Sequence, residues 1–123
     1  MTFVLRLIVL VLLLGAPAGA QQVQIGTGPI CDTQKQTERL VALLDGGAES
    51  AIKVVNAEEN DPTACVVATV AYVRGPQIAV ARAKDGTYQI VKVLVLGLHT
   101  PNGILATAPA AYFTILKVDE QDA

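Results

Sequence analysis

Two cysteines, Cys31 and Cys65, carry the most direct chemistry in this 123-residue chain. A dithiol redox pair needs Cys-x-x-Cys spacing, which is absent because the two residues lie 34 positions apart. In an oxidising compartment an even number of cysteines instead predicts structural pairing. Closing a loop of this length stabilises a fold by about 3–4 kcal/mol in the chain-entropy model. We therefore expect a disulfide between Cys31 and Cys65.

Residue types that serve catalysis are scarce. The chain has one histidine, His99, and one serine, Ser50, and no G-x-S-x-G motif surrounds Ser50. A Ser-His-Asp triad would need both of these unique residues. A structural zinc site needs about four Cys or His ligands, and only His99 remains once the cysteines are bridged. We assign no catalytic residue, no cofactor-binding residue and no metal ligand.

Charged side chains gather at two places. Glu58, Glu59 and Asp61 form the densest acidic group, but they lack the spacing of a calcium-binding loop. We interpret them as the solvated end of a helix, with weak cation binding as the alternative. Arg82 and Lys84 share one strand face near a predicted hairpin tip. Such charges protect sheet edges from pairing with other sheets, and the alternative is a small anion-binding patch.

Net charge and aromatic content exclude several classes of partner. The chain has a formal net charge of −2. Without Arg6, the remaining eight Lys and Arg residues stand against eleven Asp and Glu residues, which gives −3. A mildly acidic chain without basic clusters is not suited to nucleic acid or to an anionic membrane surface. With no Trp, three Tyr and two Phe, a platform for stacking bases is also poorly supplied.

The first twenty residues have the composition of a secretory signal peptide. Arg6 precedes the unbroken apolar run Leu7–Leu14, and Ala18-Gly19-Ala20 provides a small-x-small cleavage site before Gln21. The apolar run ends too early for a membrane span of about 20 residues, so a retained anchor is the less favoured alternative. No cysteine follows the cleavage site for lipid attachment. We predict an exported protein, periplasmic or secreted, without a stable membrane anchor.

The mature chain begins with residues that predict an extended arm and two helices. Residues 21–30 are polar and then rich in Gly and Pro, which is typical of an extended N-terminal arm. Residues 32–45 have apolar positions near helical spacing, and Thr33-x-x-Gln36 matches a capping box. Gly46-Gly47 ends this helix, since glycine adopts C-cap conformations without steric cost. Residues 48–59 place their apolar side chains on one face and predict a second helix.

From Cys65 onward the apolar period changes to that of strands. Arg74-Gly75-Pro76 and residues 99–103 read as turns, and Pro109 as the end of a short strand. Asp85-Gly86 predicts a two-residue hairpin turn, which would set Lys84 opposite Thr87. Residues 87–98 are apolar on both alternating faces and predict a central strand covered on both sides. The predicted strands are 64–73, 77–84, 87–98, 104–108 and 110–118.

Together these elements predict an α+β fold. Two short N-terminal helices pack on a four- to five-stranded antiparallel meander in a single domain over residues 31–118, followed by a polar tail at 119–123. The disulfide between Cys31 and Cys65 would clamp the helices to the sheet. The alternative is a small β-barrel plugged by the helices.

Three functions stay open, and the partner is an unknown protein or small molecule. The first is a small exported, non-catalytic binding or interaction module, which requires an exposed apolar patch or an unpaired sheet edge. The second is a small-molecule or lipid binder with a pocket between helices and sheet, because the row Ala79, Ala81 and Ala83 leaves space there. The third is a curled-sheet enzyme that uses a lone carboxylate of raised pKa with Tyr88, Tyr112 or His99.

Overall fold

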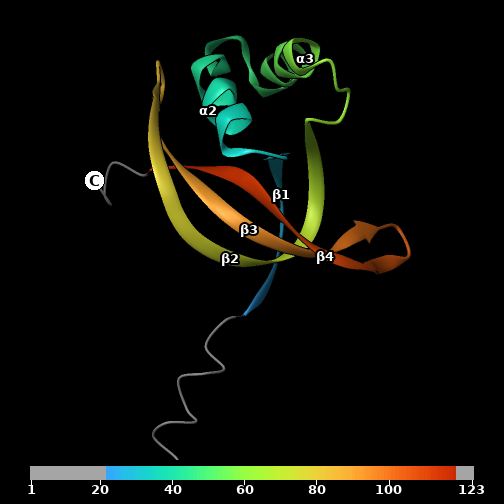
Figure 1. Cartoon of the computed structure of the whole chain (residues 1–123). Coiled ribbons are helices and arrows are strands. Elements are labelled where there is room, and N and C mark those ends of the chain that lie inside the picture. Colours follow the sequence, from blue (N-terminus) through green and yellow to red (C-terminus); the bar gives the residue numbers. More distant parts are fainter. Residues whose placement is uncertain (1–21, 119–123) are drawn as a thin grey trace, which may run out of the picture.

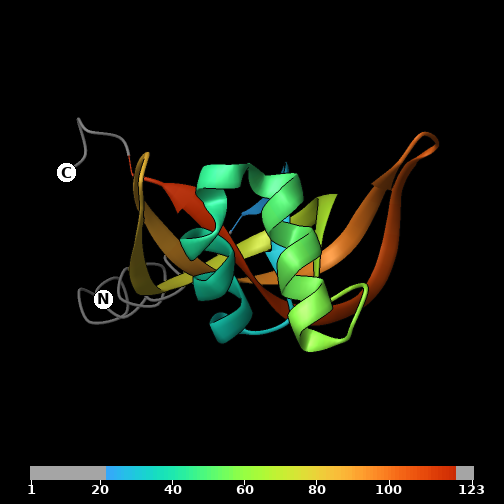
Figure 2. The same cartoon turned by 90° about the horizontal axis from the view of Figure 1, so that it is seen from above.

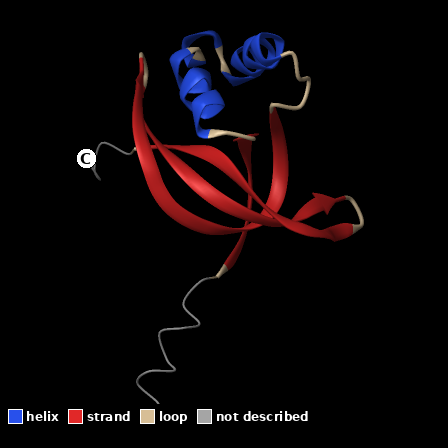
Figure 3. Ribbon diagram, viewed as in Figure 1, coloured by secondary structure: helices blue, strands red, loops and turns tan. Residues whose placement is uncertain are grey.

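The chain folds as a four-stranded antiparallel barrel with two helices across one end (Figures 1 and 3). The computed structural model describes residues 22–118, so the predicted signal peptide and the predicted tail at 119–123 lie outside the described residues. The elements follow in the order β1 (Val23–Cys31), α2 (Gln34–Ala42), η2 (Leu44–Gly46), α3 (Ala48–Glu59), β2 (Cys65–Ala83), β3 (Gly86–Thr100) and β4 (Gly103–Lys117).

The barrel is built from a meander that its first strand closes. β2, β3 and β4 pair in sequence order, and β1 pairs with β2 over nine residues, from Val23 opposite Val73 to Cys31 opposite Cys65. β4 returns to β1 at only two positions, Ile30 with Thr114 and Cys31 with Phe113. The α+β class and the antiparallel sheet are therefore confirmed, and the sheet closes into a barrel.

The predicted N-terminal arm and the predicted position of the helices were wrong. Most of residues 21–30 form strand β1, so both helices follow a strand instead of preceding the sheet. The glycines and Pro29 suggested a loop. A proline is nevertheless tolerated at a strand position where no neighbouring strand needs a hydrogen bond from its backbone nitrogen. Gly26 lets the Tyr72 ring pack closely against β1, since a Cβ there would lie 3.3 Å from Cε1 of Tyr72.

Local signals locate both helices along the sequence, although α2 is shorter than the predicted range 32–45. The capping box of α2 is confirmed: the Gln36 amide donates to Thr33 Oγ1 at 3.1 Å, and the Thr33 amide donates to Gln36 Oε1 at 3.1 Å. α3 has the predicted bounds. Seen from above, the two helices lie side by side over the barrel (Figure 2). A buried cluster joins them to the strand ends, with Cys31, Leu40, Ala51, Val55 and Cys65 as members and Ile115 packed against it.

A second buried cluster fills the barrel. Val91, Val93 and Val95 of β3 pack with Val70 of β2, and Tyr72 and Tyr112 lie against them. β3 pairs on both sides and is the central strand that the sequence predicts. Its other face is only partly covered, because Leu94 is 41% exposed. The expectation of cover on both sides was wrong along this part of the strand.

Strand breaks and hairpin register also differ from the predictions. β2 runs through residues 74–76 and β4 runs through Pro109, because irregular pairings in each ladder absorb the turn-forming residues. Gly75 permits a close approach of backbones, since a Cβ there would lie 2.6 Å from the Lys92 carbonyl oxygen. At the first hairpin Arg82, not Lys84, faces Thr87. This displacement by two residues keeps the side chains from Ala79 to the turn on their predicted faces, up to the irregular pairing between Gln77 and Ala79.

Candidate functional site

The barrel opens where β1 and β4 separate. The Thr114 hydroxyl donates to the Pro29 carbonyl at 2.6 Å, beside the two positions at which β1 and β4 pair. Beyond this point β1 turns into α2, so within residues 22–118 the outer edge of β4 from Gly103 to Tyr112 has no strand partner. A cavity of about 370 Å³ lies at this opening. A smaller cavity of about 140 Å³ lies on the other side of the two positions at which β1 and β4 pair.

The walls of the larger cavity are mostly apolar. They come from β1, β2, β3 and β4, which present Ile30, Val66, Val70, Val95, Leu98 and Ala110. Val70 and Val95 belong to the buried cluster of the barrel, so the floor of the cavity is part of the core. The polar lining groups are Asp32, Thr63, Thr107 and Tyr112. Such a cavity suits an apolar molecule with few polar atoms.

Strand alternation brings Asp32 to the cavity. The Asp32 amide donates to the Ala64 carbonyl at 2.9 Å, which extends the β1–β2 ladder by one residue. Since successive side chains point to opposite faces, Cys31 enters the helix cluster while Ile30 and Asp32 line the cavity. Partial burial and then the nearby Asp61 raise the pKa of Asp32. Asp32 itself is exposed, which places its carboxyl at the cavity mouth.

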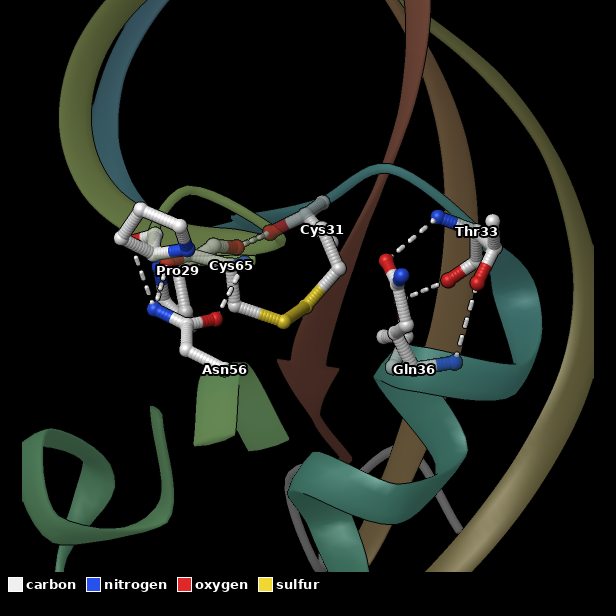
Figure 4. Close-up of a disulfide and its surroundings, with 9 residues drawn as sticks. Pro29, Cys31, Thr33, Gln36, Asn56 and Cys65 are labelled. Carbon is white, nitrogen blue, oxygen red and sulfur yellow. Dashed lines mark hydrogen bonds between the residues drawn. A yellow bond between two sulfur atoms is a disulfide. The ribbon is translucent and has the colours of Figure 1, made fainter. Parts of the chain in front are cut away.

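A disulfide and an asparagine hold this corner of the barrel (Figure 4). Cys31 and Cys65 are bonded, with their Cα atoms 4.1 Å apart, and the bond joins β1 to β2 at the base of the helical segment. On the other side of Cys65, the Asn56 side chain of α3 accepts from the Cys65 amide at 2.8 Å and donates to the Cys65 carbonyl at 3.0 Å. Asn56 also donates to the Pro62 carbonyl at 2.9 Å. The amide group therefore acts as a strand partner for the start of β2.

The structure separates most of the residues that the sequence analysis considered. The disulfide is confirmed. Ser50 lies at the start of α3 and His99 near the end of β3, both exposed, and neither lines the two cavities. The alanine row Ala79, Ala81 and Ala83 also lines neither cavity, so the space that it leaves is not the pocket that we expected there.

The predicted acidic group is divided between two environments. Glu58 accepts from Arg39 Nε at 3.0 Å and from Nη2 at 2.9 Å, and this pairing lowers its pKa. Asp61 instead accepts from the Thr63 amide at 2.9 Å and fixes the loop before β2. Within residues 22–118 no three His, Cys, Asp or Glu side chains gather as a metal site would require.

The proposed tyrosine and carboxylate pairs behave differently from each other. The Tyr88 hydroxyl donates to Asp85 Oδ2 at 2.7 Å, and this hydrogen bond lowers the pKa of Asp85. The pair lies outside both cavities and holds the first hairpin. Tyr112 shares the larger cavity with Asp32, the carboxyl of raised pKa, but no hydrogen bond joins these two side chains.

Neither the place of Asp32 in the cavity lining nor the contacts of Asn56 were predicted from the sequence. The sequence pattern placed Asp32 in the first predicted helix, residues 32–45, whereas the structure has it between β1 and α2. The alternation after Ile30 predicts the direction of its side chain only once residues 23–31 are recognised as a strand. Among the described helices, none has the length and hydropathy to cross a membrane. Comparison of the chain with family models, curated proteins and solved structures finds no match.

Proposed function

We propose that the chain is a small exported, non-catalytic binding protein whose barrel takes up a small apolar molecule. The observation that carries this proposal is the cavity of about 370 Å³ at the opening between β1 and β4. Ligand pockets in proteins range from about 300 to 1,000 Å³ and are lined mainly by apolar groups with a few polar ones. The cavity lies at the small end of that range and has this kind of lining.

The frame around the cavity supports a preformed site. Its floor belongs to the buried valine cluster, and the disulfide and Asn56 fix the strand ends beside it. A preformed site loses little conformational entropy when it binds, which favours affinity for a small ligand. Export is in keeping with the disulfide, since such bonds persist in oxidising compartments.

A cavity-filling variant tests this function. Ala110 lines the cavity, whereas its neighbour Ala111 is exposed on the opposite face of β4. We expect the neutral fluorescent probe N-phenyl-1-naphthylamine to bind the mature chain saturably at one site. Ala110→Phe should weaken this binding at least tenfold, and Ala111→Phe should leave it unchanged. Equal binding by both variants, or no saturable binding by the unaltered chain, would contradict the proposal.

A second candidate is an interaction module that adds an extended protein segment to its sheet. Within the described residues the edge of β4 from Gly103 to Tyr112 is unpaired, and its hairpin with β3 projects from the barrel (Figure 1). Leu98, Ile104 and Leu105 near the hairpin tip are 41%, 49% and 59% exposed. A free edge of this kind accepts a strand through main-chain hydrogen bonds.

Hydrogen exchange distinguishes this second candidate from the first. An extended apolar peptide selected for binding from a random library should protect the amides of residues 103–112. Leu105→Lys should abolish its binding, while Leu116→Lys, an exposed change elsewhere on the same strand, should not. Protection confined to the helices would rule out strand addition at this edge.

A further inference from the structure

We propose that the cavity selects apolar molecules that end in a cationic group, such as an alkylammonium ion, and that Asp32 is the counter-ion of that group. This inference rests on the proposed binding function and adds the chemical class of the ligand. It follows from which charged groups line the cavity, which of them are already paired, and where they stand relative to the apolar walls.

Among residues 22–118, Asp32 is the only charged residue in the lining. The other polar lining residues of this part of the chain are Thr63, Thr107 and Tyr112, which carry hydroxyl groups, and none of its Lys, Arg or His residues contributes to the walls. An apolar chain on the barrel floor would therefore reach a single charged group at the cavity mouth. A molecule with an apolar body and one oppositely charged end matches this arrangement.

The cavity brings no cation of its own to Asp32. Within residues 22–118, the ion pairs join Arg39 to Glu58, Lys84 to Asp45 and Lys117 to Asp85, and none includes Asp32. The neighbouring charge is instead a second carboxylate, Asp61, whose repulsion contributes to the raised pKa of Asp32. Asp61 is held by the amide and the hydroxyl of Thr63, so it stays beside the mouth. A bound cation would relieve this repulsion.

The same arrangement disfavours a fatty acid. Its carboxylate would lie beside Asp32 and Asp61, and like charges at short range repel. An alcohol of the same chain length has no charge, so its affinity should lie between that of the alkylammonium ion and that of the fatty acid. Because Asp32 is exposed, water screens the pair, and we expect the ammonium ion to bind about tenfold more tightly than the alcohol, a modest ratio for an ion pair.

Three probes of equal chain length test the inference: octylammonium chloride, octanol and sodium octanoate. The affinity of each probe is measured by its displacement of N-phenyl-1-naphthylamine from the mature protein at neutral pH and low salt. The expected order of affinity is octylammonium, then octanol, then octanoate. Added salt should weaken octylammonium binding and leave octanol binding unchanged, because salt screens only the charged interaction.

Substitutions test whether Asp32 is the residue that causes the preference for octylammonium over octanol. Asp32→Asn should remove the tenfold advantage of octylammonium over octanol without changing octanol affinity, and Asp32→Glu should retain part of it. Glu49→Gln is the matched control, since Glu49 is an exposed carboxylate on α3 outside the cavity lining and its replacement alters net charge equally. It should leave the order of the probes intact.

The outcomes separate the two proposals. If none of the three probes binds, the binding function itself fails. If all three bind with equal affinity, or octanoate binds best, the cavity is a ligand site but the inference about charge is wrong. If the preference for octylammonium persists in Asp32→Asn, Asp32 is not the counter-ion. The series on the unaltered protein decides the charge preference even if a variant fails to fold.

Discussion

The Asn56 side chain is the contact whose removal should be most informative about this fold. β3 pairs with β2 only from Val70 onward, so no strand of the described residues 22–118 lies beside the Cys65 backbone on the side away from β1. The Asn56 amide replaces that neighbour through its two hydrogen bonds to Cys65. Asn56→Ala removes both, together with the bond to Pro62, and leaves the amide and carbonyl of a fully buried residue without partners.

The expected loss follows from these unmade hydrogen bonds. A buried polar group without a partner costs about 1–3 kcal/mol, and Asn56 is half-buried, so water can compensate in part. We therefore expect Asn56→Ala to lower the free energy of unfolding by about 2–4 kcal/mol. With a urea m-value of about 2 kcal/mol/M, in the middle of the range for small domains, the unfolding midpoint should fall by roughly 1–2 M.

Urea unfolding of the oxidised protein measures this change. Lys53→Ala is the matched control, because Lys53 is exposed on the same helix and should change stability by less than about 0.5 kcal/mol. Asn56→Asp keeps the acceptor for the Cys65 amide but sets a carboxylate oxygen against two carbonyls, so it should destabilise at least as much as alanine. A loss below about 0.5 kcal/mol for Asn56→Ala would refute the reasoning.

Three further predictions concern the barrel and its cavity. Gly75→Ala should destabilise by about 1–3 kcal/mol, because backbone fills the space of its Cβ, whereas Gly28→Ala meets nothing within 4 Å and should be tolerated in thermal melting. Val93→Asp should abolish cooperative folding seen by circular dichroism, since Val93 is 3% exposed, and Leu94→Asp at 41% exposure should not. Because the pKa of Asp32 is raised in the folded state, the folded protein binds more protons than the unfolded protein at pH values just above the ordinary carboxyl pKa. The free energy of unfolding therefore falls as the pH rises between the ordinary pKa and the raised one. Asp32→Asn should therefore be no less stable than the unaltered protein at neutral pH in urea unfolding, and a clear loss would contradict the cause that we assign to the pKa shift.

Sequence patterns predicted what depends on near neighbours. The capping box at Thr33 and Gln36, the bounds of α3 and the central position of β3 all follow from residues a few positions apart. The disulfide was predicted from the number of cysteines and their expected compartment. These features need no knowledge of which strands meet.

Features that depend on distant pairing were missed. Residues 23–31 contain two glycines and a proline and look like a loop until β2, more than thirty residues later, supplies a partner. The continuity of β4 through Pro109 likewise depends on an irregular pairing with β3. Because the strand character of β1 was missed, the alternation that sends Asp32 toward the cavity could not be derived, and the site was missed with it.

The Cys31–Cys65 disulfide and the Asn56 side chain together form a clamp on the start of β2, and residues beside this clamp line the cavity. Ile30 and Asp32 flank Cys31, while Val66 follows Cys65, and these three flanking residues all line the cavity. Loosening the clamp would therefore move two cavity walls relative to each other. The apparent affinity of the protein for a ligand is proportional to the fraction of protein molecules whose cavity walls are in the arrangement that binds it. Asn56→Ala should consequently weaken octylammonium and octanol by the same factor under conditions where the protein stays folded. A selective loss of octylammonium would instead mean that Asn56 acts on the charge of Asp32, and not on the walls.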